Sequence, residues 1–111
     1  MSDRVTAELR ALSRAAFGQT YRLEVMLAVA GSSDGIVNLT DLAHELGQST
    51  SNIQGPLRSL VEIGSISPAP QGDSRRKHYI RNPSAAWQWA REMRDEATAA
   101  AGLPAHRSPV A

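Results

Sequence analysis

The feature that most constrains this chain is a pair of short helical patterns on either side of one glycine, Gly47. Apolar residues recur every three or four positions in 40–46 and again in 49–64, as they do on the buried face of a helix. Two short helices joined by a glycine turn form a helix-turn-helix arrangement. The apolar positions are Leu42, Ala43 and Leu46 in the first pattern, and Ile53, Leu57, Leu60 and Val61 in the second.

Both helices begin with residues that are suited to capping. Thr40 is expected to be the N-cap of the first helix, because its hydroxyl can accept a hydrogen bond from a free amide of the first turn. Asp41 is favourable beside it, near the positive end of the helix dipole. Ser49, Thr50 and Ser51 are candidate caps of the second helix.

Gly55 and Pro56 fall inside the second helix. A proline in a helix interior removes one backbone hydrogen bond and costs about 3 kcal/mol. The helix is therefore either kinked but continuous, or its regular part begins near Pro56, since proline is favourable in a first turn. We favour the kinked, continuous helix and keep the second interpretation as the alternative.

Helices are also expected outside this pair. Helical periodicity extends over 3–17 and 84–101, where Ser84 can act as N-cap, and over the strongly apolar segment 20–31, which is expected to be central to the core. Residues 36–39 suffice only for a short strand. The terminal helices carry apolar stripes formed by Val5, Leu9, Leu12 and Ala16, and by Ala86, Trp89, Ala90, Met93, Ala97 and Ala100, with Trp87 on a different side.

A charged hairpin is expected after the second helix of the pair. Residues 65–68 and 78–81 are its predicted strands, and the dipeptide 72–73, Gly-Asp, supplies the bend. Three consecutive basic residues, 75–77, lie at or beside its tip. Between residues 48 and 82 five basic residues face two acidic ones, whereas the whole chain has a net charge of +1. The positive charge is therefore concentrated locally.

The run 42-LAHELGQSTSNIQGPLRSLVEIGSI-66 resembles the helix-turn-helix of bacterial winged-helix regulators, especially the arsenic-repressor-like (ArsR-like) family and, more loosely, the MarR-like family. Ala43 matches the small position where the two helices cross, and Gly47 matches the turn. The resemblance implies a mainly α fold with a small β-wing, flanked by N- and C-terminal helices. Its implied boundaries are a single domain over 1–101, with the helix-turn-helix at about 40–64, the wing at about 65–82 and a flexible tail at 102–111.

The same resemblance implies sequence-specific binding of double-stranded DNA by a transcriptional regulator, with the second helix in the major groove and the wing on the minor groove or backbone. The residue types are suitable, because Asn and Gln can pair with adenine, Arg with guanine, and hydroxyls with phosphates. Two structural alternatives remain open, namely that the polar residues only cap the helix and that the charged hairpin only keeps a sheet edge soluble. The candidate DNA-binding residues are Ser49, Thr50, Ser51, Asn52, Gln54, Arg58, Arg75, Arg76 and Lys77.

The stripes of the terminal helices predict a homodimer, because they would otherwise add exposed apolar surface to a small monomer. In the resembling families the terminal helices commonly form such an interface. The alternative is that the two helices pack on each other within one chain. The candidate dimer-interface residues are Val5, Leu9, Leu12, Trp89, Met93 and Ala97.

Neither a metal site nor a catalytic site is expected. The chain has no cysteine, and His44, His78 and His106 share no ligand spacing. Ser, His and Asp occur without a nucleophile motif around them. We therefore expect a protein without a cofactor and without enzymatic activity.

No run approaches the roughly 20 apolar residues of a membrane span, and the N-terminus lacks a secretory apolar core, so a cytoplasmic location is expected. A small organic effector between the terminal helices and the core, with Trp87 or Trp89 in its wall, is left open. The operator sequence and the choice between repression and activation are open too. The alternative function is a winged helix used for protein association without DNA binding.

Overall fold

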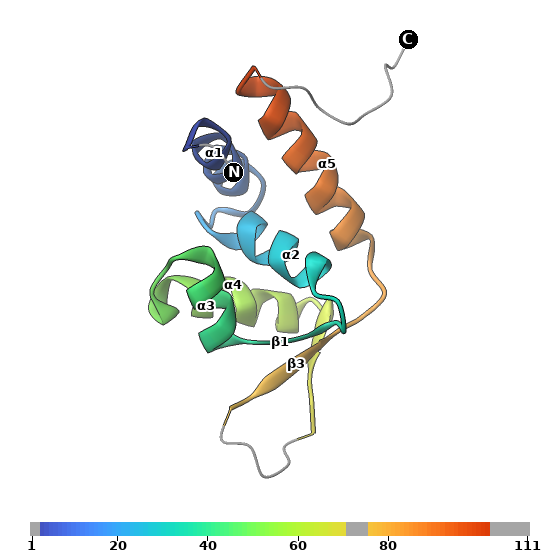
Figure 1. Ribbon diagram of the computed structural model, residues 1–111. Coiled ribbons are helices and arrows are strands. Elements are labelled where there is room, and N and C mark those ends of the chain that lie inside the picture. The colour runs from blue at the N-terminus through green and yellow to red at the C-terminus, as the bar shows by residue number, and fades with distance from the viewer. Residues whose placement is uncertain (1–2, 71–75, 103–111) are drawn as a thin grey trace.

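The computed structural model describes residues 3–70 and 76–102, and its described part contains five helices and three strands (Figure 1). A mainly α chain with a small β-wing was expected from the sequence, and this expectation is confirmed. The elements in chain order are α1 (Asp3–Phe17), α2 (Arg22–Gly31), β1 (Ile36–Asn38), α3 (Leu39–Leu46), α4 (Thr50–Glu62), β2 (Ile66–Pro68), β3 (His78–Arg81) and α5 (Ala85–Ala100).

The wing is an antiparallel sheet of three strands in the order β1-β3-β2. Its two predicted strands pair with Ser67 opposite Ile80, and β1 adds a third strand in which Ile36 lies opposite Ile80. Tyr79 points to the other side of β3 and packs against the core. The sheet therefore joins the loop before α3 to the hairpin after α4, and this fixes both ends of the helix-turn-helix.

Helix α2 lies at the centre of the core, as its apolar sequence predicts. It contacts α1, α3, α4 and α5, which surround it in Figure 1. Leu23, Val25, Met26 and Val29 are all buried. In the described ranges, no helix has the length and apolar character needed to cross a membrane.

The two terminal helices pack on each other and on α2 within one chain. Val5, Leu9, Met93 and Ala97 are buried there, and Leu12 is partly buried against the same core. The expectation that this stripe would be exposed in a monomer is therefore wrong for these residues.

Among the candidate interface residues, Trp89 alone is largely open, with 47% of its surface exposed. The buried stripe of α5 includes Trp87 instead, whose indole Nε1 donates to the Asn82 carbonyl at 2.8 Å. Ala90, Met93 and Ala97 belong to both the predicted and the buried stripe, so the two faces differ mainly in that Trp87 takes the place of Trp89. A 16-residue helix with many alanines allows either assignment, because alanine is compatible with both faces.

Helix α3 begins two residues earlier than a cap at Thr40 predicts, because its N-cap is Asn38. The Asn38 Oδ1 accepts from the Asp41 amide at 2.9 Å, while its Nδ2 donates to the Asp41 Oδ2 at 2.8 Å. This reciprocal pair satisfies a free amide of the first turn and orients the carboxylate as well. Thr40 therefore lies inside the helix, where its side chain is exposed.

Candidate nucleic-acid interface

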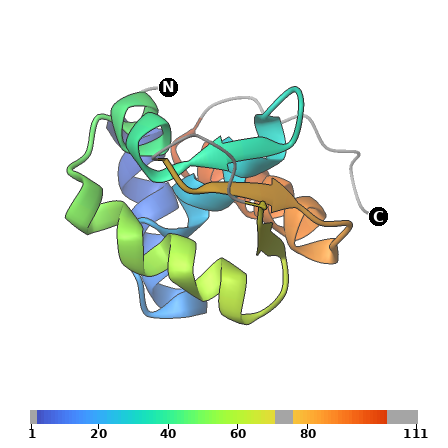
Figure 2. The ribbon, with the colours of Figure 1, turned by 90° about the horizontal axis from the view of Figure 1, so that it is seen from below.

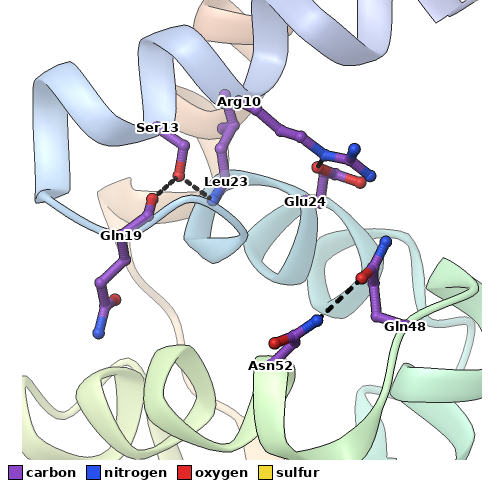
Figure 3. Close-up of polar contacts among 7 residues, drawn as sticks. All are labelled: Arg10, Ser13, Gln19, Leu23, Glu24, Gln48 and Asn52. Carbon is purple, nitrogen blue, oxygen red and sulfur yellow. Dashed lines mark hydrogen bonds and ion pairs between the residues drawn. The ribbon is translucent and has the colours of Figure 1, made fainter.

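The start of α4 is fixed by side-chain caps, as the sequence predicts. The Ser49 Oγ accepts from the Asn52 amide at 3.3 Å and lies 3.0 Å from the Ser51 Oγ. The Asn52 side chain in turn donates to the Gln48 Oε1 at 3.1 Å (Figure 3). Both the capping role and the exposure of these residues are thus observed, so capping does not exclude a role in binding.

Helix α4 is continuous through Gly55 and Pro56. The alternative in which the regular helix begins near Pro56 is therefore wrong. Pro56 is buried on the core side of the helix, next in sequence to the buried Leu57. Because proline has no amide hydrogen, the carbonyl of Asn52 loses its usual intrahelical donor at this point.

The polar side chains of α4 lie on the face opposite the core. Ile53, Leu57 and Leu60 are buried, which turns the remaining face of the helix to solvent. Every recognition-helix residue that the sequence singled out is exposed: Ser49, Thr50, Ser51, Asn52, Gln54 and Arg58.

A cleft of about 580 Å³ lies between α4, the start of α3 and the base of the wing. Figure 2, which views the molecule from below, shows α3, α4 and the wing together on the face turned to the viewer. The cleft brings two predicted residues of α4, Gln54 and Arg58, onto one concave surface with two predicted residues of the wing, Arg76 and Lys77. The hydroxyl residue Thr40 and the aromatic Tyr79 also line it.

The remaining predicted residues lie elsewhere or are not described. Ser49, Thr50, Ser51 and Asn52 are at the N-terminal end of α4 and are not part of the cleft lining. Arg75, the bend at 72–73 and the tail residues 103–111 lie outside the described residues.

The positive charge of the cleft is partly balanced by one acidic neighbour. The Arg76 Nη1 lies 3.4 Å from the Asp41 Oδ1, and both side chains are more than half exposed. An exposed ion pair of this kind contributes only about 0–1 kcal/mol, because water and salt screen it. Asp41 therefore does not prevent Arg76 from contacting an anionic partner.

Arg81 is one of the five basic residues between residues 48 and 82, but the fold gives it a role other than binding an anion. Its Nη1 donates to the carbonyls of Val29, Ala30 and Ser32 at 3.0, 3.1 and 2.9 Å. A cation at these carbonyls is favourable, because they form the negative end of α2. In the sequence, this role is indicated only by strand alternation, which places Arg81 on the same side of β3 as Tyr79, a residue that packs against the core.

No group of three or more His, Asp or Glu residues within 3–70 and 76–102 is arranged to hold a metal ion. His44 is exposed on α3, and His78 is half-buried on β3. His106 lies outside the described residues. The described residues thus give no chemical reason to assign a metal to the cleft.

The sequence matches no protein-family model and no curated protein. The structure is similar to the crystal structure of AbsC, a MarR family transcriptional regulator from Streptomyces coelicolor, with a TM-score of 0.66 and 14% identity. That match covers 87% of this chain and 68% of AbsC. A probable transcriptional regulator from Pseudomonas aeruginosa matches with a TM-score of 0.61 and 18% identity, over 86% of this chain and 78% of that one.

These similarities establish the fold. The chain has the winged-helix architecture that the sequence predicts, and the two structural neighbours share it. AbsC is described as a MarR family protein, the looser of the two families expected, and at 14% identity the similarity shows the shared fold. Neither neighbour is described as an ArsR-like protein.

Proposed function

We propose that this chain is a transcriptional regulator that binds specific sequences of double-stranded DNA. The observation that carries the proposal is the shared concave surface on which Gln54 and Arg58 of α4 meet Arg76 and Lys77 of the wing. A recognition helix enters the major groove, and a basic wing can contact the adjacent minor groove or backbone. The two structural neighbours, both described as transcriptional regulators, support the proposal.

Within this proposal the residues divide by chemistry. Gln54 and Asn52 can form paired hydrogen bonds with adenine, and Arg58 can do so with guanine, so these residues read sequence. The hydroxyls of Ser49, Thr50 and Ser51 are suited to phosphate contacts that fix the position of the protein. Arg75, Arg76 and Lys77 are proposed to bind phosphates or a narrow minor groove, where the negative potential favours cations.

We further propose that the regulator acts as a homodimer through α1 and α5. The support differs from that expected at first, because most of the predicted stripe is already buried within one chain. What remains open is Trp89, whose ring meets Phe17 edge-to-face at a centroid distance of 5.2 Å. A half-exposed tryptophan on a rigid support is typical of an interface anchor.

Sedimentation tests the dimer. Deletion of α5 is unsuitable, because it would remove buried core residues. Trp89→Glu changes an exposed residue of α5 and leaves those core residues in place. We expect the wild-type chain to be a dimer and Trp89→Glu to shift it towards the monomer. Ile36→Glu is the matched control, since Ile36 is also 47% exposed and lies in β1, which pairs with β3 rather than with a terminal helix. A monomeric wild-type chain, or equal effects of both variants, would contradict the proposal.

DNA binding itself is tested by selecting binders from a random duplex library and measuring affinity by fluorescence anisotropy at several salt concentrations. We expect an inverted repeat with half-sites about one helical turn apart. The logarithm of the binding constant should fall linearly with that of the salt concentration, because phosphate contacts release counterions. No selected sequence and no salt dependence would favour the alternative, a winged helix that serves protein association.

Two further parts of the hypothesis concern location and control. Binding to chromosomal DNA implies the cytoplasm as the site of action. A small organic effector between the terminal helices and the core is part of the same proposal, with Trp89 rather than Trp87 in its wall, because Trp87 is buried and hydrogen-bonded in the core. Of the two tryptophans considered for its wall, only Trp89 is open to solvent.

A further inference from the structure

The recognition helix has an intrinsic weak point in its middle. Gly55 is the least favourable helix residue apart from proline, and Pro56 removes one backbone hydrogen bond beside it. Gln54 and Arg58 flank this pair, and both line the cleft. Any bending at the weak point would therefore displace the residues proposed to read DNA.

A side chain from the loop between α1 and α2 contacts α4 at this point. The Gln19 Nε2 donates to the Ser59 Oγ at 3.1 Å, and the Ser59 Oγ donates to the Gly55 carbonyl at 3.1 Å. A methyl group added at Gly55 would lie 3.8 Å from the Gln19 Nε2. This side of α4 thus faces the loop rather than the cleft.

The loop is itself anchored to α1 by a buried serine. The Ser13 Oγ donates a short hydrogen bond to the Gln19 carbonyl and accepts one from the Leu23 amide at 3.1 Å. Figure 3 shows Ser13 joining these two groups, with the Gln19 amide pointing towards α4. Ser13 is fully buried in the stripe that α1 turns to the core. Ser13 therefore holds the backbone of Gln19 to α1, while the side chain of Gln19 is bonded to α4 at Ser59.

Gln19 is not the side chain that stability alone would favour at this position. Its Oε1 is buried and has no hydrogen-bond partner among the described residues. A buried polar atom without a partner lowers stability, whereas an apolar side chain of similar shape would not carry that cost. The amide contributes one directed contact to α4 instead.

We propose that Gln19 is a positioning residue for DNA recognition. It holds the Gly55-Pro56 segment of α4 against the loop between α1 and α2, so that Gln54 and Arg58 keep their orientation in the cleft. This inference rests on the proposed DNA-binding function. It goes beyond that function because Gln19 does not line the cleft and contacts Ser59, on a different face of α4 from Gln54 and Arg58.

The test uses Gln19→Met, which keeps the length of the side chain and removes the amide. We expect the preference for the selected operator over an unrelated duplex to fall about tenfold, the size of effect expected from one lost hydrogen bond. The melting temperature should stay equal or rise, because the buried unsatisfied oxygen is removed. The control is Thr98→Val, which deletes a comparable contact, the bond from the Thr98 Oγ1 to the Arg94 carbonyl, in α5.

A second substitution makes the role of the weak point explicit. Gly55→Ala stiffens the helix and has room for its methyl group on the loop side. If Gln19 compensates for the weak point, Gly55→Ala should recover at least half of the preference lost in Gln19→Met. An unchanged preference in Gln19→Met, or a loss that only follows a lowered melting temperature, would overturn the inference.

Hydrogen exchange in the free protein separates this inference from the proposed function. We expect amides over 54–59 to exchange faster in Gln19→Met, with the amides of α2 unchanged. If the wild-type chain prefers no DNA sequence, the proposed function fails, and exchange alone decides whether Gln19 positions α4. Equal exchange in both proteins would overturn the inference even if operator binding were observed.

Discussion

The two ends of the molecule use amphipathic helices in different ways. At one end, which we call the recognition end, α3, α4 and the wing surround an open polar cleft. At the other end, the terminal pair α1 and α5 turns its apolar residues inwards, where they meet each other and α2. Both ends have apolar stripes of similar spacing. At the recognition end the exposed residues include the amide and cationic side chains of the cleft, whereas the terminal pair exposes mostly alanine and charged residues together with Trp89.

The comparison shows that an apolar stripe predicts burial but not the partner that covers it. Helix α4 is amphipathic because one face joins the core and the other faces solvent. Helices α1 and α5 have the same periodicity, but here the stripes that were expected to form a dimer interface already have intramolecular partners. Evidence for a dimer must therefore come from what stays exposed after folding.

The largest expected effect tests this difference at the terminal pair. Leu9→Ala should lower the free energy of unfolding by about 2–5 kcal/mol, because Leu9 is only 1% exposed and the deletion leaves a cavity. Trp89→Ala should cost less, about 1–2 kcal/mol, because it loses the contact with Phe17 and the burial of only about half a side chain. Urea denaturation measures both. If Trp89→Ala were the more destabilising change in a monomeric sample, our assignment of the core face would be wrong.

The next effect concerns a cation of the recognition end that stabilises the core. Arg81→Met should lower the free energy of unfolding by roughly 2 kcal/mol, since charged hydrogen bonds contribute about 1.5–3 kcal/mol and three carbonyls lose their donor. The salt dependence of DNA binding should not change in the folded variant. A flatter salt slope would show that Arg81 contacts phosphate and would contradict its assignment to α2.

A smaller effect separates the two halves of the cleft by removing one charge from each. Arg58→Ala should cost about 1–3 kcal/mol on the selected operator and little on an unrelated duplex, because a base contact is lost. Lys77→Ala should weaken binding on all sequences and reduce the salt slope by about 1. Both residues are exposed, so unfolding should be nearly unaffected. If each variant lost as much affinity for the unrelated duplex as for the operator, the proposed division between sequence reading by α4 and phosphate binding by the wing would be wrong.

The smallest effect is a pH dependence in the loop before β1. Hydrogen bonds from the Ile36 amide and the Ser32 hydroxyl lower the pKa of Asp34 below its ordinary value of 3.8. The stabilisation is therefore fully present above that value and is lost as the pH falls through the lowered pKa of the folded state. In Asp34→Asn, the free energy of unfolding measured with urea should fall less between pH 5 and pH 2 than in the wild-type chain. An equal fall in both proteins would assign this pH dependence to another carboxylate.

Much of the fold could be predicted because its signals are local. Ser49 and Ser84 cap α4 and α5 as expected, and Gly47 adopts the left-handed conformation that ends α3. The capping of α3 was mispredicted, because Thr40 and Asn38 are both suitable caps and only two residues apart. The choice between them depends on Asn38 ending a strand that pairs with β3.

The candidate site was predicted in its residues but not in its geometry. Arg58 and Gln54 could be placed on one helix face from periodicity, and the exposure of that face agrees with the structure. The cleft that unites them with Arg76 and Lys77 depends on how the wing packs, which no helical pattern encodes. Arg81 shows the limit most clearly, because its charge suggests an anionic partner and its neighbours are backbone carbonyls.

The sequence by itself determined the order and the approximate bounds of the helices and strands, which face of α4 is polar and where positive charge gathers. Caps, glycine turns and periodicity act between residues a few positions apart, so the sequence contains them directly. Only the tertiary structure decided that α1 and α5 cover each other, that Arg81 binds the end of α2 and that Gln19 reaches α4. The bonded pairs are 40 positions apart for Gln19 and Ser59 and 52 for Arg81 and Val29. Contacts at such separations form only when the whole core brings the two segments together.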